Sequence, residues 1–97
     1  MILIRVTYHT KPGMHGAFAE KLLSDGVMTA TRQEPGNVDY AFSLPIDKPN
    51  AVELLEMWED QAALDVHCTS PMFLHLRQMK EPYVTHSDIV MFDARQR

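Results

Sequence analysis

Three side chains in the second half of the sequence have the types and spacing that chemistry needs: Glu56, Trp58 and His67. Residues 52–59 are typical of a strand, in which Glu56 and Trp58 share one face. A carboxylate among apolar neighbours must be paired, or it must work with a perturbed pKa. His67 follows the apolar residues 62–66 at a predicted break between two helical segments. Its ring can therefore face the space between helix and sheet.

Each of these side chains also has a purely structural explanation. A histidine can be a satisfied core residue or a surface residue. Glu56 can form a hydrogen bond that ties its strand to a helix end or to a neighbouring subunit, and Trp58 can be an ordinary core residue. The pattern alone leaves both explanations open.

Other chemistries find no support in the sequence. The four glycines form neither a GxGxxG motif nor a P-loop, so we expect no nicotinamide or nucleotide-phosphate site. The five histidines form no HxH or HExxH motif and the single cysteine, Cys68, has no partner, so we expect no metal site. No serine lies on a glycine-flanked elbow, which argues against a hydrolase triad.

The composition narrows the class of protein further. A length of 97 residues fits one domain, over residues 1–97, and 45% hydrophobic residues exclude a disordered chain. The net charge is -4 and the basic residues are scattered, so we expect no nucleic-acid partner. No apolar run approaches the roughly 18 residues of a membrane span, and the N-terminal apolar run resembles a strand rather than a signal peptide. A single cysteine favours the reducing cytoplasm.

The periodicity predicts an α+β protein with the order β-α-β-β-α-β. Asp60 and Ser70 are predicted N-caps, the second followed by Pro71 at the first helical position. This order fits a ferredoxin-like sandwich with a four-stranded antiparallel sheet. The expected strands are 2–9, 38–44, 52–59 and 83–93, and the expected helical segments are 14–32, weakened at Gly26, then 61–67 and 70–81.

The predicted strands carry apolar residues on both faces, as with Leu3 beside Ile4 and Leu54 beside Leu55. Right-handed crossovers place both helical regions on one side of the sheet. The other face then needs an apolar cover. A second copy of the chain is the simplest cover, so we expect a homodimer.

Four runs of residues carry a resemblance to a known family: KPGMHGAFAE at 11–20, EPGN at 34–37, ELLEMWED at 53–60 and AALDVHCTSPMF at 62–73. In this order and spacing they resemble the antibiotic biosynthesis monooxygenase family. The resemblance implies a ferredoxin-like protomer whose open sheet face pairs with a second protomer into a dimeric α+β barrel. It also implies a pocket between helices and sheet in each copy.

The resemblance implies a cofactor-independent monooxygenase that oxidises a small aromatic or enolisable substrate with O₂, without metal or cofactor. Such a reaction needs a base, a few hydrogen-bond donors and a dry cavity. His67 fits the base, Trp58 and Phe73 fit the walls, and Asn37 or Tyr8 could position an oxygen atom.

Three alternatives stay open beside this one. The same base could serve an isomerase or another proton-transfer enzyme acting on a small carbonyl compound, or the chain could bind a small molecule without turnover. Haem degradation is less favoured, because the haem-degrading branch has a tryptophan at the position of His67 and its haem-ligating histidine falls at Arg77.

Overall fold

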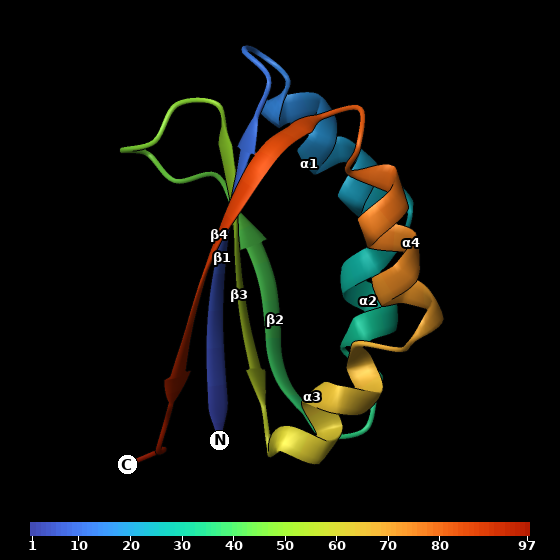
Figure 1. Cartoon of the computed structure of the whole chain (residues 1–97), viewed down its shortest axis with the longest axis vertical. Coiled ribbons are helices and arrows are strands. Elements are labelled where there is room, and N and C mark those ends of the chain that lie inside the picture. The colour runs from blue at the N-terminus through green and yellow to red at the C-terminus, as the bar shows by residue number, and fades with distance from the viewer.

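The elements follow from the alternation and caps described above. The computed structural model describes residues 1–97, and Figure 1 shows its elements in chain order. No helix is long and apolar enough to cross a membrane. The elements are β1 (Ile2–Thr10), α1 (His15–Ser24), α2 (Val27–Thr31), β2 (Asn37–Ser43), β3 (Ala51–Trp58), α3 (Gln61–His67), α4 (Pro71–Met79) and β4 (Val84–Asp93).

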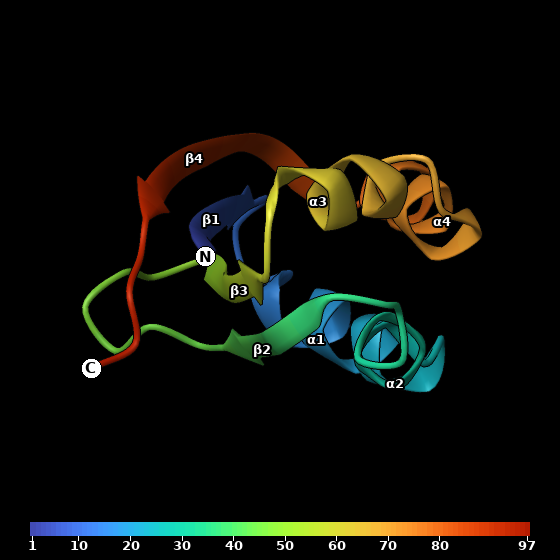
Figure 2. The ribbon, with the colours of Figure 1, turned by 90° about the horizontal axis from the view of Figure 1, so that it is seen from below.

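The four strands form one antiparallel sheet in the order β2-β3-β1-β4, with all helices on one of its faces. Seen from below, the α3–α4 pair lies on the β4 side of the sheet and the α1–α2 pair on the β2 side (Figure 2). The predicted ferredoxin-like α+β fold is confirmed. We call the sheet surface away from the helices the open face.

Alternation along the central strands builds the core. Ile4, Val6 and Tyr8 point to the helices and are buried, and Val6 pairs in register with Leu54 on β3. Phe18 on α1 packs edge-to-face on Tyr8, with ring centroids 5.5 Å apart. The helix side of β1 and β3 is therefore the surface on which α1 and α3 pack, whereas α2 packs on β2.

The prediction of one helix over residues 14–32 is wrong. The chain forms α1 and α2 instead, because Gly26 adopts a φ of 70° and so breaks the helical backbone. Leu23, near the end of α1, is 62% exposed. Val27 restarts the helix and is buried.

Both predicted N-caps of the second helical region are confirmed. The Asp60 carboxylate accepts a hydrogen bond from the Ala63 backbone N–H at 2.9 Å, and the Ser70 hydroxyl accepts one from the Phe73 N–H at 3.2 Å. Pro71 takes the first helical position of α4. The caps fix where α3 and α4 begin, and His67 lies between them at the end of α3.

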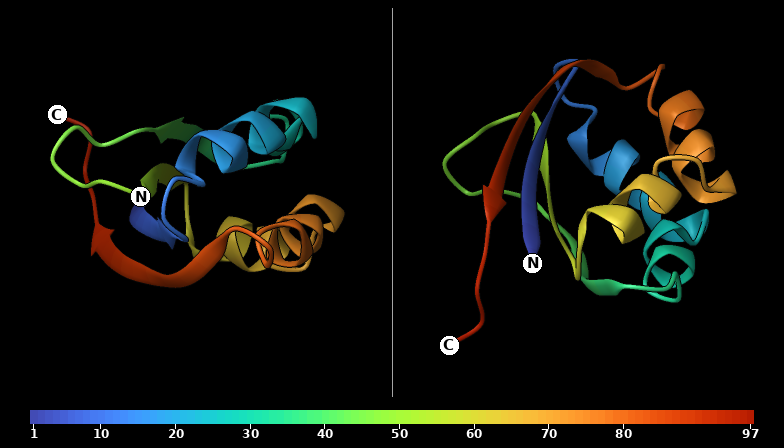
Figure 3. Two further views of the ribbon diagram at one scale, coloured as in Figure 1. Left: turned by 90° about the horizontal axis from the view of Figure 1, so that it is seen from above. Right: turned by 60° about the horizontal axis from the view of Figure 1, so that its bottom comes forward.

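The open face has two unlike ends. Three exposed apolar side chains, Leu55, Val90 and Phe92, lie beside each other near the start of β1, in register with Arg5 and Leu3. Toward the end of β1, the side chains on the open face are polar. No element of this chain covers the apolar end, and the helices lie on the opposite side in every view (Figure 3).

A close approach at Gly36 sets the distance between the turn before β2 and α3. This glycine has a φ of 82°, and an added Cβ would overlap the Ala63 Cβ. We expect Gly36→Ala to lower the free energy of unfolding by about 3 kcal/mol, from backbone strain and overpacking together.

Gly13→Ala is the matched control, because Gly13 has a similar φ of 75° but nothing within 4 Å of an added Cβ. Gly13→Ala should lower the free energy of unfolding by about 1 kcal/mol, from backbone strain alone. Urea denaturation of both variants measures the difference. Equal losses would contradict the close packing of Gly36 on α3.

Candidate active site

A cavity of about 340 Å³ opens between the helix face of the sheet and the α3–α4 pair. Its size is within the range of small-molecule sites. Apolar side chains from β1, β3, β4 and α4 form most of its wall. The polar or ionisable side chains that reach it are Tyr8, Tyr40, Glu56, His67, Cys68, Arg77, Lys80 and Ser87.

His67, the last residue of α3, presents one ring nitrogen to a carboxylate. Its Nδ1 lies 2.9 Å from Oε1 of Glu34, in the turn that follows α2. Because a carboxylate only accepts, Nδ1 of a neutral ring carries the proton and Nε2 carries the lone pair. Nε2 lies 3.9 Å from Oε1 of Glu56, which is too far for a hydrogen bond.

Aromatic rings hold the imidazole in place. The ring centroid of His67 lies 4.5 Å from that of Trp58, 5.3 Å from Phe73 and 6.1 Å from Tyr40. The residue is only 3% exposed, yet it lines the cavity. Its contact with a ligand would therefore take place away from bulk water.

Glu56 lies on β3 with its carboxyl group buried beside this ring. Its Oε1 accepts a hydrogen bond from Nε1 of Trp58 at 2.8 Å. Burial raises the pKa of Glu56, and the Trp58 N–H and the nearby His67 oppose only part of that rise. The expected structural hydrogen bond is present, but it runs to Trp58 on the same strand rather than to a helix end.

Two further ionisable side chains on the cavity wall stay neutral. Burial raises the pKa of Tyr8, so its phenol keeps its proton and can donate a hydrogen bond. Burial also raises the pKa of the Cys68 thiol, which makes it a poor nucleophile.

Two cations, one on α4 and one directly after it, lie over aromatic rings of the wall. The Arg77 guanidinium carbon lies 5.9 Å from the Phe73 ring centroid, and Lys80 Nζ lies 5.8 Å from that of Tyr8. Both side chains line the cavity. An anionic group of a ligand would find complementary charge there.

The structure brings together some of the predicted site residues and separates others. His67, Tyr8 and Phe73 all line the cavity, as expected. Trp58 does not: it is fully buried behind His67 and holds that ring from the far side.

Asn37, predicted to position a substrate oxygen, is not among the residues that line the cavity. It sits at a bulge at the start of β2, where its Nδ2 donates to the Asp39 carbonyl at 3.1 Å and to the Met57 carbonyl at 3.4 Å. The side chain thus stabilises the sheet edge.

The sequence interpretation did not include Glu34, Tyr40, Arg77 or Lys80 among the residues of the site. Glu34 belongs to the run EPGN at 34–37, whose proline and glycine indicate a turn and give no sign of a site residue. The alternation of β2 is the signal that could have identified Tyr40, because its side chain points to the helices and is buried. Nothing in the sequence pairs Glu34 with a histidine 33 residues away.

Comparisons with known proteins agree with this fold. A family model described as antibiotic biosynthesis monooxygenase matches residues 1–79. Over 51 residues the chain is 35% identical to an uncharacterized protein of Synechocystis sp.. That stretch is 53% of this chain and only 35% of the relative's length.

Several solved structures share the architecture. A crystal structure of an antibiotic biosynthesis monooxygenase superposes with a TM-score of 0.81 at 26% identity, covering 99% of this chain and 100% of that one. A Shewanella oneidensis protein superposes with a TM-score of 0.83 at 26% identity, covering 94% of this chain and 87% of that one. A Pseudomonas aeruginosa protein superposes with a TM-score of 0.84 at 21% identity, covering 98% of this chain and 94% of that one. At this identity the similarity shows the fold alone.

The raised pKa of Glu56 predicts how stability changes with pH. Above the ordinary value of 4.5, the unfolded chain loses a proton that the folded chain keeps. The free energy of unfolding should therefore fall as the pH rises from 4.5 through the folded-state pKa. Glu56→Gln keeps an oxygen acceptor for the Trp58 N–H but cannot ionise. Over the same pH range, the free energy of unfolding of this variant should fall less than that of the wild type.

Urea denaturation across this pH range measures the effect. Glu20→Gln, at an exposed position of α1, controls for the loss of one carboxylate and should follow the wild type. Parallel curves for Glu56→Gln and the wild type would contradict the assignment.

Proposed function

The chain belongs to the antibiotic biosynthesis monooxygenase family, and on this premise we propose that it is a cofactor-independent monooxygenase whose substrate binds in the cavity beside His67. One observation carries the proposal. Nδ1 of a buried histidine is fixed by the Glu34 carboxylate, while its Nε2 makes no hydrogen bond within the chain and the ring lines the cavity. That is the arrangement of a positioned general base.

The proposed reaction begins with proton transfer from the substrate to Nε2 of His67. The Glu34 carboxylate, 2.9 Å from Nδ1, stabilises the imidazolium that forms. The substrate anion is rich in electrons and reacts directly with O₂. Conversion of a CH₂ group to a carbonyl consumes one O₂ and releases one water, so the electrons balance without a reductant.

The wall of the cavity indicates the class of substrate. Aromatic and aliphatic side chains suit a flat apolar molecule, and Arg77 and Lys80 favour the negative charge that develops on its oxygen. The neutral phenol of Tyr8 can donate a hydrogen bond to the same oxygen. We therefore propose an aromatic or enolisable substrate with an acidic hydroxyl or C–H group.

A proton-transfer enzyme, such as an isomerase of a small carbonyl compound, is the second candidate. The observation that favours it is the buried Glu56, whose raised pKa and 3.9 Å distance from His67 Nε2 give the cavity a second group that can carry a proton. Substrate turnover without O₂ uptake would select this candidate. Binding without turnover would select a small-molecule binder.

Haem degradation fits the cavity poorly. Arg77 stands where the haem-degrading branch has its histidine, and a guanidinium offers iron no lone pair. His75, two residues away, pairs with Asp25 at 2.7 Å and does not line the cavity.

The assignment of His67 predicts the effect of its replacement. His67→Gln should lower kcat by roughly 10² to 10⁴, the usual contribution of a general base. His75→Gln is the matched control, because it replaces another histidine that pairs with a carboxylate, and it should keep wild-type turnover. Oxygen uptake with a panel of anthrones and polyphenols provides the measurement.

Circular dichroism must show that His67→Gln is folded, since the residue is buried. Full turnover by the folded variant, on a compound that the wild type oxidises, would rule out His67 as the base.

We also propose that a second copy of the chain covers the apolar end of the open face. The exposed side chains Leu55, Val90 and Phe92 form a contiguous patch there, and family resemblance favours pairing through this face. Burial of such a patch would couple folding to association.

Replacement within this patch tests the dimer. Phe92→Glu should convert a dimer to a monomer, because it places a charge in the buried interface. Leu74→Glu on α4 is the matched control, since Leu74 is 49% exposed and Phe92 50%, and it should leave the dimer intact. Sedimentation at micromolar concentration gives the masses, and a monomeric wild type would refute the proposal.

A further inference from the structure

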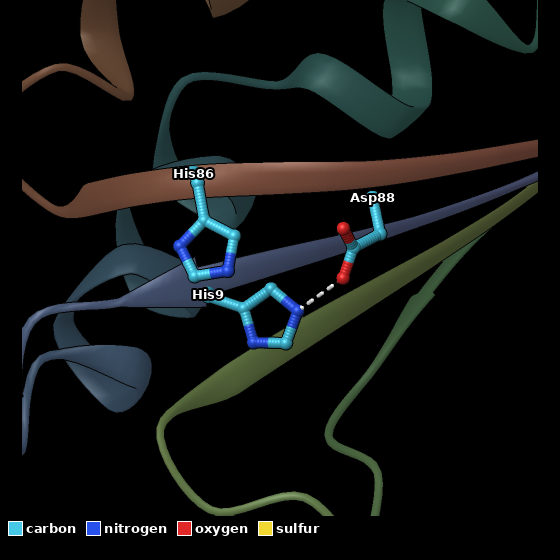
Figure 4. A group of neighbouring side chains, drawn as sticks. All are labelled: His9, His86 and Asp88. Carbon is cyan, nitrogen blue, oxygen red and sulfur yellow. Dashed lines mark hydrogen bonds and ion pairs between the residues drawn. The ribbon is translucent and has the colours of Figure 1, made fainter.

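Three side chains that the proposed reaction does not use meet on the open face, opposite the cavity. His9 comes from β1, and His86 and Asp88 come from β4 (Figure 4). His9 and His86 are register partners across the two strands, and Asp88 follows two residues later on the same face. We propose that these three side chains bind a divalent transition-metal ion such as Zn²⁺.

The distances suit a metal ion after small side-chain rotations. One ligand atom from each residue lies within 4.8 Å of the other two. His9 Nε2 and Asp88 Oδ2 are 2.7 Å apart, and the two imidazole rings stack with centroids 4.3 Å apart. Zinc bonds of about 2.0 to 2.2 Å place tetrahedral ligands roughly 3.3 Å apart, so the close His9–Asp88 pair must separate by about half an ångström and the His86 nitrogen must approach by an ångström or so. The side chains of His9 and Asp88 are 29% and 67% exposed, which leaves room for such rotations.

A neighbouring hydroxyl prepares His86 as a ligand. The Thr85 hydroxyl donates its only hydrogen to the His9 carbonyl at 3.0 Å. Its oxygen can then only accept from His86 Nδ1, also 3.0 Å away, so Nδ1 carries the proton. The lone pair of a neutral His86 is therefore on Nε2, and an outer hydrogen bond that fixes a tautomer in this way is typical of metal-ligating histidines.

The pair of His9 and Asp88 offers the other two ligand atoms. In the 2.7 Å contact, Nε2 of His9 donates its proton to Oδ2 of Asp88. A metal ion can take the place of that proton, because both atoms are established ligand types once deprotonated. In a neutral imidazole the displaced hydrogen moves to Nδ1 of His9, and only an imidazolium would release it to solvent.

The donor set selects the class of ion. Two imidazoles and one carboxylate suit zinc, copper, nickel or iron, whereas calcium and magnesium prefer oxygen ligands alone. Three protein ligands leave a coordination position for water. The site lies on the sheet face opposite the His67 cavity, so this inference is independent of the proposed reaction.

Sequence inspection missed this cluster because His9 and Asp88 are 79 residues apart. Metal motifs read from sequence rely on ligands within one turn or one strand. Here the antiparallel pairing of the first and last strands brings the ligands together.

Isothermal titration calorimetry tests the site. Zinc chloride is titrated into the full chain, which carries no polyhistidine tag and has been freed of metal by a chelator. We expect saturation at one ion per chain. His9→Ala, His86→Ala and Asp88→Asn should each weaken binding at least about tenfold, as the loss of a ligand requires. Co²⁺ in place of Zn²⁺ should give visible d–d absorption that these variants lose.

His75→Ala is the matched control, because it removes a histidine–carboxylate pair of the same 2.7 Å length that has no second histidine beside it. It should bind zinc as the wild type does. The proposal is overturned if the wild type takes up no zinc, if His86→Ala binds it unchanged, or if His75→Ala loses binding to the same extent. Circular dichroism of these exposed-site variants confirms that they fold.

Discussion

The hydrogen bond between Glu34 Oε1 and His67 Nδ1 is the contact on which the active site depends. It joins the turn after α2 to the end of α3, two segments that are far apart in the sequence. It decides which ring nitrogen carries the proton, and it leaves the other nitrogen toward the cavity. Without it, a buried imidazole could rotate or exchange tautomers and would not act as a positioned base.

The rest of the fold holds this contact in place. Gly36 allows α3 to approach the turn that contains Glu34, because any side chain there would overlap Ala63. Trp58 and Phe73 hold the ring from two sides, and the Asp60 cap fixes the start of α3. Glu56 adds a second buried carboxyl whose raised pKa follows from its enclosure. Stability and site geometry therefore depend on the same residues.

Local patterns in the sequence were enough to predict the strands, the two N-caps and the ferredoxin-like order, because alternation, Asp60 and Ser70 act over a few residues. The family resemblance, and not these local patterns, suggested that His67, Tyr8 and Phe73 share a pocket. The local patterns failed where the interaction is distant: Glu34 meets His67 across 33 residues, and His9 meets Asp88 across 79. The break at Gly26 and the bulge at Asn37 depend on backbone torsions that hydrophobic periodicity does not contain.

The protonation of the His67 ring tests the central claim most directly. Long-range ¹H–¹⁵N correlation spectra of the uniformly labelled chain report which imidazole nitrogen carries hydrogen, and His67→Gln identifies the signals of this residue. For the neutral form of the ring, the hydrogen bond to Glu34 predicts the proton on Nδ1 and the lone pair on Nε2. A neutral ring with its proton on Nε2 would contradict the account, since no base would then face the cavity.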